Sequence, residues 1–314
     1  MKYRILGSTG ARVSVVGIGT WQFGGEWGRS YTQSDADEII DAARQEGINL
    51  IDTAECYGDH LSERLVGKAI ARDRDKWIVA TKFGHRYTNP FEREQLWTAR
   101  DVEKQLDASL LALRTDYIDL YQFHSGPNDV FDNPELWQML RRLKAAGKVR
   151  HLGISISPNT NVHQTDRAVE VGAEAIQVVY NRLDREPEEA VFSSCERQNL
   201  GVLARVPLAS GFLSGKYQPG ARFDATDVRS TRDAAKNDEL LRKVARIRQD
   251  EVPEGTDMAS WALAWCLRHN AVTSVIPGCK SPEQVRSNSR AVAMVDEMPA
   301  DTAGTARHRE TPGE

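Results

Sequence analysis

INLIDTAECYGDHLSERLVGKAIARDRDKWIVATK, residues 48–82, is the stretch that decides the fold of this protein. It starts with an apolar run at 48–53, continues through a segment of helical period at 59–72, and ends with a second apolar run at 77–82. A strand, a helix and a strand in this order form the repeating unit of a parallel sheet. The stretch therefore predicts one β-α-β unit, whose first strand ends at the carboxylate of Asp52.

The same alternation recurs along the chain. Short apolar and β-branched runs are separated by longer segments in which apolar residues return every three or four positions, the period of a helix packed on a sheet. We expect strands at 15–19, 48–53, 77–82, 117–123, 149–155, 175–181, 201–207 and 274–278.

Three of the intervening segments carry clear helix signals. In 34–47, Ser34 is the expected N-cap, acidic residues occupy the first turn, and Gly47 is the expected terminator. The segment 101–114 repeats apolar residues at i, i+4 and i+8, and 135–148 ends in a cationic turn. Amphipathic helices between strands are what cover both faces of a parallel sheet.

Eight strand–helix units without an interruption predict an α/β fold, a (β/α)₈ TIM barrel. A doubly wound sheet would need a GxGxxG turn after the first strand, and GIGTWQFGG at 17–25 is a poor match. The start of the chain reads as an N-terminal β-hairpin, and long loops at 83–99 and 208–236 follow strands, which places them at the C-terminal face of the barrel. We expect a single domain over 1–300 and a disordered tail at 301–314.

Composition narrows the class of protein. The net charge is −4 with acidic and basic residues interspersed, which argues against nucleic acid or an anionic membrane as partner. The N-terminus has no signal-peptide pattern and no apolar run is long enough to cross a bilayer. The cysteines are widely spaced, so we expect them to be reduced thiols and the protein to be cytoplasmic. They are Cys56, Cys195, Cys266 and Cys279.

Four polar residues follow the ends of consecutive strands: Asp52, Tyr57, Lys82 and His124. In a barrel these ends share one mouth, where an Asp–Lys ion pair would hold the ammonium beside the phenol, lower the pKa of Tyr57 and make it a general acid. Taken singly, an Asp here is more often a helix N-cap and a His more often a core residue. All four on consecutive connections favour a catalytic site.

These residues and their surroundings resemble the aldo-keto reductase superfamily over nearly the full chain. The similar segments are LGSTGARVSVVGIGTWQFGG, NLIDTAECYG, SERLVGKAI, VATK, YIDLYQFH, KVRHLGIS, QVVYN, VPLASGFLSGKY and VTSVIPGCKSPEQVRSN. The resemblance implies that Asp52, Tyr57, Lys82 and His124 are the family's catalytic tetrad. It also implies direct hydride transfer from NADPH, in preference to NADH, to an aldehyde or ketone, without a metal.

The resemblance further implies a set of cofactor-binding positions, among which Lys280 is the expected contact of the 2′-phosphate. Two positions depart from the family pattern: Ile156 stands where Asn is usual, and Arg205 stands where an aromatic ring often stacks on the nicotinamide. A cation there should favour the reduced cofactor. The set is Gly19, Thr20, Trp21, Ser155, Gln177, Arg205, Pro207, Leu208, Ser210, Leu213, Lys216, Gly278, Lys280, Gln284 and Asn288.

Trp21, Trp27, Phe83 and Tyr87 are the expected substrate-binding residues. A cavity lined by these residues suits sugar aldehydes, hydroxy-ketones and small phosphorylated or carboxylated carbonyl compounds. The sequence implies no oligomer. An alternative function is a cofactor-binding, redox-sensing subunit with slow turnover, like the potassium-channel β subunits. A metal-dependent barrel lyase or isomerase is rejected because the other histidines are scattered over loops and helices. Glu63 is expected to be solvated.

Overall fold

The computed structural model describes residues 1–297, so the tail expected at 301–314 lies outside the described residues. Eight parallel strands form one sheet in the order β12-β11-β10-β9-β8-β5-β4-β3, and bridges from Val16 to Val275 and from Gly19 to Gly278 join its two edges. The predicted barrel is therefore confirmed. The strands are β3 (Ile18–Gly19), β4 (Leu50–Asp52), β5 (Ile78–Phe83), β8 (Ile118–His124), β9 (Val149–Ser155), β10 (Ala173–Val179), β11 (Gly201–Arg205) and β12 (Ser274–Ile276).

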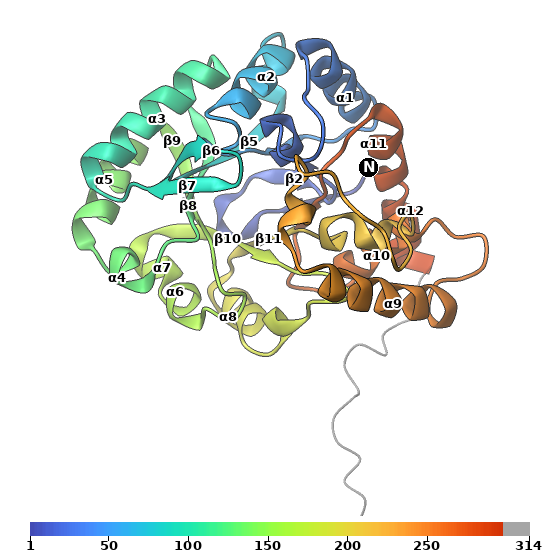
Figure 1. Ribbon diagram of the computed structural model, residues 1–314. Helices are drawn as coiled ribbons and strands as arrows, with labels where there is room; N and C mark the ends of the chain where they lie inside the picture. Colours follow the sequence, from blue (N-terminus) through green and yellow to red (C-terminus); the bar gives the residue numbers. More distant parts are fainter. Residues whose placement is uncertain (298–314) are drawn as a thin grey trace, which may run out of the picture.

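Helices surround the strands as an outer ring (Figure 1). Their apolar faces pack on the strands in one continuous core, to which Trp261 and Trp265 belong, as the i, i+4 spacing of the pair suggests. The helices are α1 (Gln33–Gln45), α2 (Leu61–Ile70), α3 (Ala99–Leu113), α4 (Asn128–Phe131), α5 (Pro134–Ala145), α6 (Val162–Asp166), α7 (Ala168–Val171), α8 (Val191–Gln198), α9 (Ala234–Asp250), α10 (Met258–Leu267), α11 (Pro282–Ser289) and α12 (Ala291–Glu297).

The N-terminal hairpin of β1 (Tyr3–Ile5) and β2 (Arg12–Ser14) closes the bottom of the barrel, at the N-terminal ends of the strands. Leu6 and Val13 from this hairpin join a small cluster of strand side chains inside the barrel. The contact is tight, because a Cβ on Gly7 would stand 2.1 Å from the backbone nitrogen of Gly201. The C-terminal mouth is the end of the barrel where enzymes of this fold keep their chemistry.

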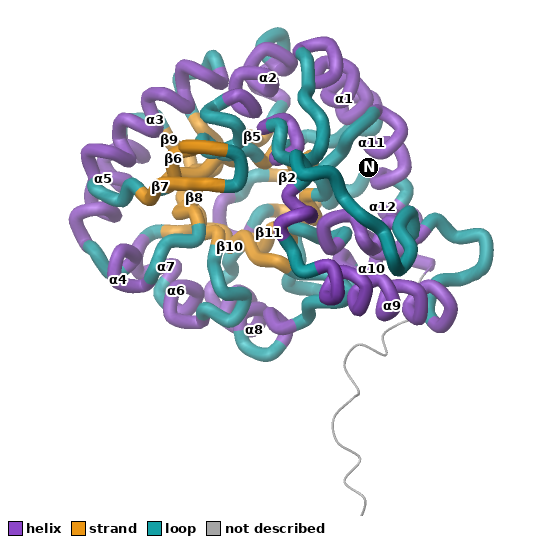
Figure 2. Tube along the Cα trace, in the orientation of Figure 1, coloured by secondary structure: helices purple, strands orange, loops and turns teal. Residues whose placement is uncertain are grey.

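Two long connections cover that mouth. The first, predicted as a loop at 83–99, contains an antiparallel hairpin, β6 (His85–Asn89) and β7 (Glu92–Gln95). The second runs from β11 to α9. Figure 2 shows both in front of the barrel strands, on the same side of the molecule. Helix α9 was not predicted, because its many charged residues surround few apolar positions and give it a weak helical pattern.

Two further expectations were wrong in detail. Thr32, rather than Ser34, caps α1: the Asp35 amide donates to Thr32 Oγ1 (3.2 Å) and the Thr32 amide donates to Asp35 Oδ2 (2.8 Å). Glu63 is fully buried rather than solvated, because Thr81 and His60 supply its hydrogen-bond partners, each at 2.5 Å.

The remaining sequence-level observations concern the cysteines and the membrane. All four cysteines are buried free thiols. Among residues 1–297, no helix is both long and apolar enough to cross a membrane.

Candidate active site

The four predicted tetrad residues converge at the mouth. Lys82 Nζ, buried at the end of β5, donates to Asp52 Oδ2 (2.8 Å), to the carbonyl of Thr53 (2.7 Å) and to the Tyr57 hydroxyl oxygen (3.2 Å). These bonds use all three protons of the ammonium. Since the Tyr57 oxygen accepts from Lys82, its own proton is free to point into the cavity that the ring borders.

The Asp52 carboxylate is held from its other side by two amides. Gln177 Nε2 donates to Oδ1 at 2.7 Å, and Gln122 Nε2 approaches the same atom at 3.3 Å. Both glutamines are fully buried on β10 and β8. The ion pair is thus held in place by neighbours on three strands. Asp52 therefore does not serve merely as a helix N-cap.

The structure corrects the expected direction of the Tyr57 pKa. Burial raises the pKa of Tyr57 to about 12, while the charge of Lys82 lowers it only in part. Burial also lowers the pKa of Lys82, but Asp52 and Tyr57 outweigh that effect and leave it above its usual value. At neutral pH both groups carry their protons, so the pair is a proton donor in its resting state.

His124, at the end of β8, stands edge-on to the Tyr57 ring, with centroids 6.4 Å apart. Burial, followed by the charge of Lys82, lowers its pKa well below the usual value, so the imidazole is neutral. His85 from the β6–β7 hairpin donates through Nε2 to the His124 carbonyl at 2.6 Å. A neutral imidazole beside the phenol can orient a carbonyl oxygen without competing for charge.

A cavity of about 780 Å³ runs from the tetrad along the mouth to α11. Asp52, Tyr57 and His124 line it, and Lys82 lies just beneath. Most predicted cofactor and substrate residues also line it: Gly19, Thr20, Trp21, Trp27, Gln177, Arg205, Pro207, Leu208, Ser210, Lys216, Gly278, Lys280, Gln284 and Asn288.

Four predicted residues do not line this cavity. Phe83 follows Lys82 on β5, so strand alternation turns it outward, where it packs on Tyr121 with ring centroids 4.8 Å apart. Tyr87 lies on the hairpin, where Arg93 Cζ is 5.0 Å from the centroid of the Tyr87 ring. Leu213 is buried in the core, and Ser155 is buried with its hydroxyl 3.5 Å from Gln177 Oε1.

A buried glutamate that the sequence analysis missed organises the wall of the cavity. Glu26 accepts from the Trp21 indole (2.8 Å) and from the Phe91 amide (2.6 Å), and it pairs with Arg93. It thereby fastens the β6–β7 hairpin to the end of the first strand. Glu26 follows Gly24 and Gly25 outside any regular helix or strand, so no local sequence pattern predicted its burial.

The loop after β11 is strained where it borders the cavity. Val206, Ala209 and Ser210 have φ of 54°, 48° and 59°, in the left-handed region. For a β-branched residue such as Val206 this is a rare conformation, costing on the order of 1–3 kcal/mol and usually found at functional sites. Successive backbone amides in such turns can form a concave binding site for an anion.

The far end of the cavity is cationic. Lys280 Nζ donates to the carbonyl of Trp27 at 2.8 Å, and burial, then the charge of Arg229, lowers the pKa of Lys280. Lys216 and Arg29 add further positive charge, with Asp227 opposing it. The N-terminus of α11 begins here, capped by Ser281.

These features fit a nicotinamide dinucleotide. Arg205 stands at the expected ring-stacking position and is partly buried. Its buried Nε has no partner among the described residues, whereas Nη2 donates to the Ile156 carbonyl at 3.3 Å. At the floor of the cavity, Gly19 and Gly278 leave no room for a side chain. A Cβ on Gly19 would stand 2.8 Å from the carbonyl oxygen of Ile276. The backbone at Ile156 thus contacts Arg205 where the family usually offers an Asn side chain.

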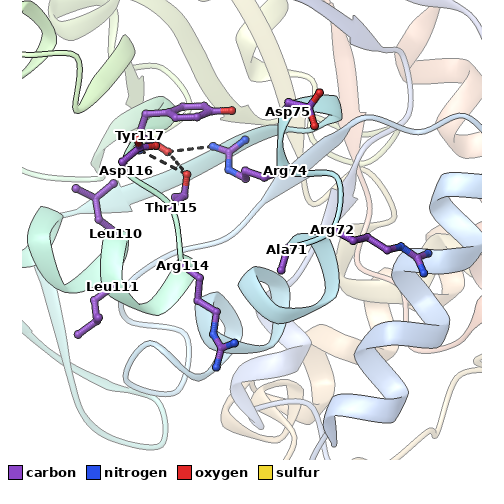
Figure 3. A pocket seen from close by; sticks show the side chains of 10 residues that line it. All are labelled: Ala71, Arg72, Arg74, Asp75, Leu110, Leu111, Arg114, Thr115, Asp116 and Tyr117. Carbon is purple, nitrogen blue, oxygen red and sulfur yellow. Dashed lines mark hydrogen bonds between the residues drawn. The ribbon is translucent and has the colours of Figure 1, made fainter.

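A second hollow, of about 940 Å³, lies at the opposite end of the barrel (Figure 3). It is bordered by the ends of α2 and α3 and by residues that precede β5 and β8, where Arg74 donates to the Tyr117 carbonyl at 3.0 Å. Its lining holds none of the tetrad residues. The chemistry-bearing residues gather at the other mouth.

Comparison with known proteins agrees with this geometry. "Aldo-keto reductase YhdN" of Bacillus subtilis is 33% identical over 297 residues, covering 92% of this chain and 88% of the relative. The "NADH-specific methylglyoxal reductase" of Escherichia coli is 30% identical (93% and 94% covered), and a "probable voltage-gated potassium channel subunit beta" of Arabidopsis thaliana is 27% identical (94% and 92%).

A solved structure is also similar over nearly its whole length. The aldo-keto reductase AKR11C1 from Bacillus halodurans, in its holo form, aligns with a TM-score of 0.77 and 31% identity, covering 95% of this chain and 94% of that one. The family model described as "Aldo/keto reductase family" matches residues 15–303. The chain belongs to the aldo/keto reductase family.

Proposed function

We propose that the protein reduces the carbonyl of a small aldehyde or ketone to an alcohol, reversibly, with NADPH as the hydride donor and Tyr57 as the general acid. The observation that carries this proposal is the contact between the Lys82 ammonium and the Tyr57 hydroxyl, 3.2 Å apart at the bottom of the cavity. A protonated phenol beside a fixed cation is suited to protonating an alkoxide.

The residues of this chain divide the work of the reaction. When bound, the nicotinamide supplies the hydride. Tyr57 gives its proton to the carbonyl oxygen as negative charge develops there, and the resulting phenolate is stabilised by Lys82. Asp52 keeps Lys82 charged and in place. Neutral His124 orients the substrate oxygen toward Tyr57, and Trp21, 6.0 Å from the Tyr57 ring centroid, forms the apolar wall above it.

The preference for NADPH rests on the cationic end of the cavity. The positive charges of Arg229, Lys216 and Arg29 act on Lys280 there, with Asp227 as the opposing acid. A 2′-phosphate would gain charge-assisted hydrogen bonds in this place, each worth about 1.5–3 kcal/mol. Because one relative is named as specific for NADH, both cofactors belong in the test.

The test is steady-state oxidation of NADPH and NADH with a panel of sugar aldehydes, hydroxy-ketones, and phosphorylated and carboxylated carbonyls. Multiple turnovers are expected with NADPH, and Tyr57→Phe should reduce kcat by roughly 10²–10⁴-fold. The matched control is Tyr87→Phe, which removes a phenol outside the cavity and should leave kcat within about twofold. Equal turnover by the Tyr57 variant would contradict the proposed mechanism.

A second candidate function is a cofactor-binding regulatory subunit, favoured by the similarity to a probable channel β subunit. Such a protein would oxidise one bound equivalent of NADPH without entering a steady state. Rapid mixing that resolves a single turnover from continuous turnover separates the two candidates.

A further inference from the structure

Next to His124 lie two residues, Glu55 and Cys56, that the proposed reduction does not use. Glu55 and Cys56 follow β4 in the same loop as Tyr57. Cys56 Sγ and Glu55 Oε1 each lie 3.9 Å from His124 Nδ1. One ligand atom from each of the three residues lies within 4.8 Å of the other two.

The carboxylate in this cluster is incompletely satisfied. Glu55 is buried, and its Oε1 accepts from the His85 amide at 3.0 Å. Its Oε2 is also buried but has no hydrogen-bond partner among the described residues. A buried carboxylate oxygen without a donor is costly, and a cation is one partner that would remove this cost.

We propose that Glu55, Cys56 and His124 form a binding site for a zinc-class divalent cation, and that the cation inhibits the enzyme. A thiolate, an imidazole nitrogen and a carboxylate oxygen are all zinc ligands, at about 2.0–2.3 Å from the metal. Ligands of a tetrahedral ion at these distances stand roughly 3.3–3.7 Å apart. The two separations of 3.9 Å are close to these values, and the third, between Cys56 and Glu55, is within 4.8 Å, so the ligand atoms would have to draw together by up to about 1 Å.

Access and charge both suit such an ion. Cys56 and His124 line the cavity, so a cation can reach them from its mouth and keep its fourth position open toward the cavity. Coordination deprotonates a thiol, so Cys56 and Glu55 together would balance the two charges of the ion. Burial and the charge of Glu55 raise the pKa of the Cys56 thiol, and Arg93 and Lys82 lower it in part, so a bound ion would have to supply the charge that keeps the thiolate. An anionic ligand pair would in turn offset the repulsion of the ion by Lys82 and Arg93.

Inhibition follows from the position of the site. The ion would hold the His124 ring through Nδ1 and add positive charge close to Lys82. That fixes the ring in an orientation set by the metal instead of by the substrate oxygen. This part of the proposal rests on the proposed reductase function, whereas binding of the metal does not.

The test is titration of the purified full-length chain with Co²⁺, a spectroscopic substitute for zinc, in the absence of chelators. A thiolate-to-cobalt charge-transfer band and tetrahedral d–d bands should saturate at one equivalent, and Zn²⁺ should displace them. Cys56→Ala should abolish the charge-transfer band, and Glu55→Gln should weaken binding at least tenfold. The matched control, Cys195→Ala, removes another buried thiol and should keep the bands.

Absence of a charge-transfer band in the native chain, or equal affinity in Cys56→Ala, would place the cobalt on other groups and overturn the site. In the same preparation, Zn²⁺ should lower carbonyl turnover and a chelator should restore it. Undiminished turnover with the site saturated would overturn inhibition. If no carbonyl is turned over at all, the proposed reductase function fails while the cobalt spectrum still decides the metal site.

Discussion

Glu26 fastens the β6–β7 hairpin over the active site, and Glu26→Gln should release it. The carboxylate is 2% exposed and receives three donors, from Trp21, Phe91 and the Arg93 guanidinium. Glutamine keeps the shape but loses the charge and offers one oxygen in place of two. Breaking a buried ion pair costs about 3–5 kcal/mol. Because the Arg93 side chain is 18% exposed, we expect about 2–4 kcal/mol.

The assay is native-state amide hydrogen exchange, resolved for residues 85–95. A loss of about 2–4 kcal/mol should speed exchange in the hairpin by roughly 30- to 1000-fold, while strand β8 should keep its rates. The matched control is Glu94→Gln, which breaks the exposed Arg86–Glu94 pair of the same hairpin and should cost at most about 0.5 kcal/mol. Hairpin exchange within threefold of the native rate in Glu26→Gln, or an equal effect of Glu94→Gln, would refute this account.

Three further predictions concern single charges. Lys280→Met should raise the Kd of NADPH by roughly tenfold or more and leave that of NADH within about threefold, as measured by fluorescence titration; equal losses for both would contradict a 2′-phosphate contact. Asp52→Asn should lower kcat at least tenfold because Lys82 loses its counter-charge, with little change in the Kd of the cofactor. The pKa of Asp73 is lowered by its hydrogen bonds from Arg44, so the stability that Asp73→Asn removes should be present at pH 7 and shrink as pH falls below about 4. Urea unfolding at several pH values checks this, and a pH-independent difference would contradict it.

The positions of the strands and of the tetrad could be read from the sequence because each depends on local periodicity. Apolar runs of five to seven residues define a buried parallel strand whatever its partners are. All eight strands overlap their predicted ranges. Asp52, Lys82 and His124 end three of these strands, and strand ends in a barrel share one mouth.

Side-chain direction and loop packing could not be read in the same way. Phe83 was expected beside the substrate, but it is adjacent to Lys82 on β5, and successive strand residues point to opposite faces. The burial of Glu26 and Glu63 was not predicted because important hydrogen-bond donors to them, Phe91 and Thr81, are distant in the chain. A charged residue looks solvated, whether in a loop like Glu26 or in a helix like Glu63, until its partners are placed.

The sequence by itself determined the barrel, its N-terminal hairpin and the meeting of Asp52, Tyr57, Lys82 and His124, since these follow from the order of elements. The tertiary structure alone decided the protonation of the site. Burial raises the pKa of Tyr57 to about 12 despite Lys82, because desolvation depends on every neighbouring atom. It likewise decided which residues surround Glu55 and Cys56, since those contacts join segments that only packing brings together.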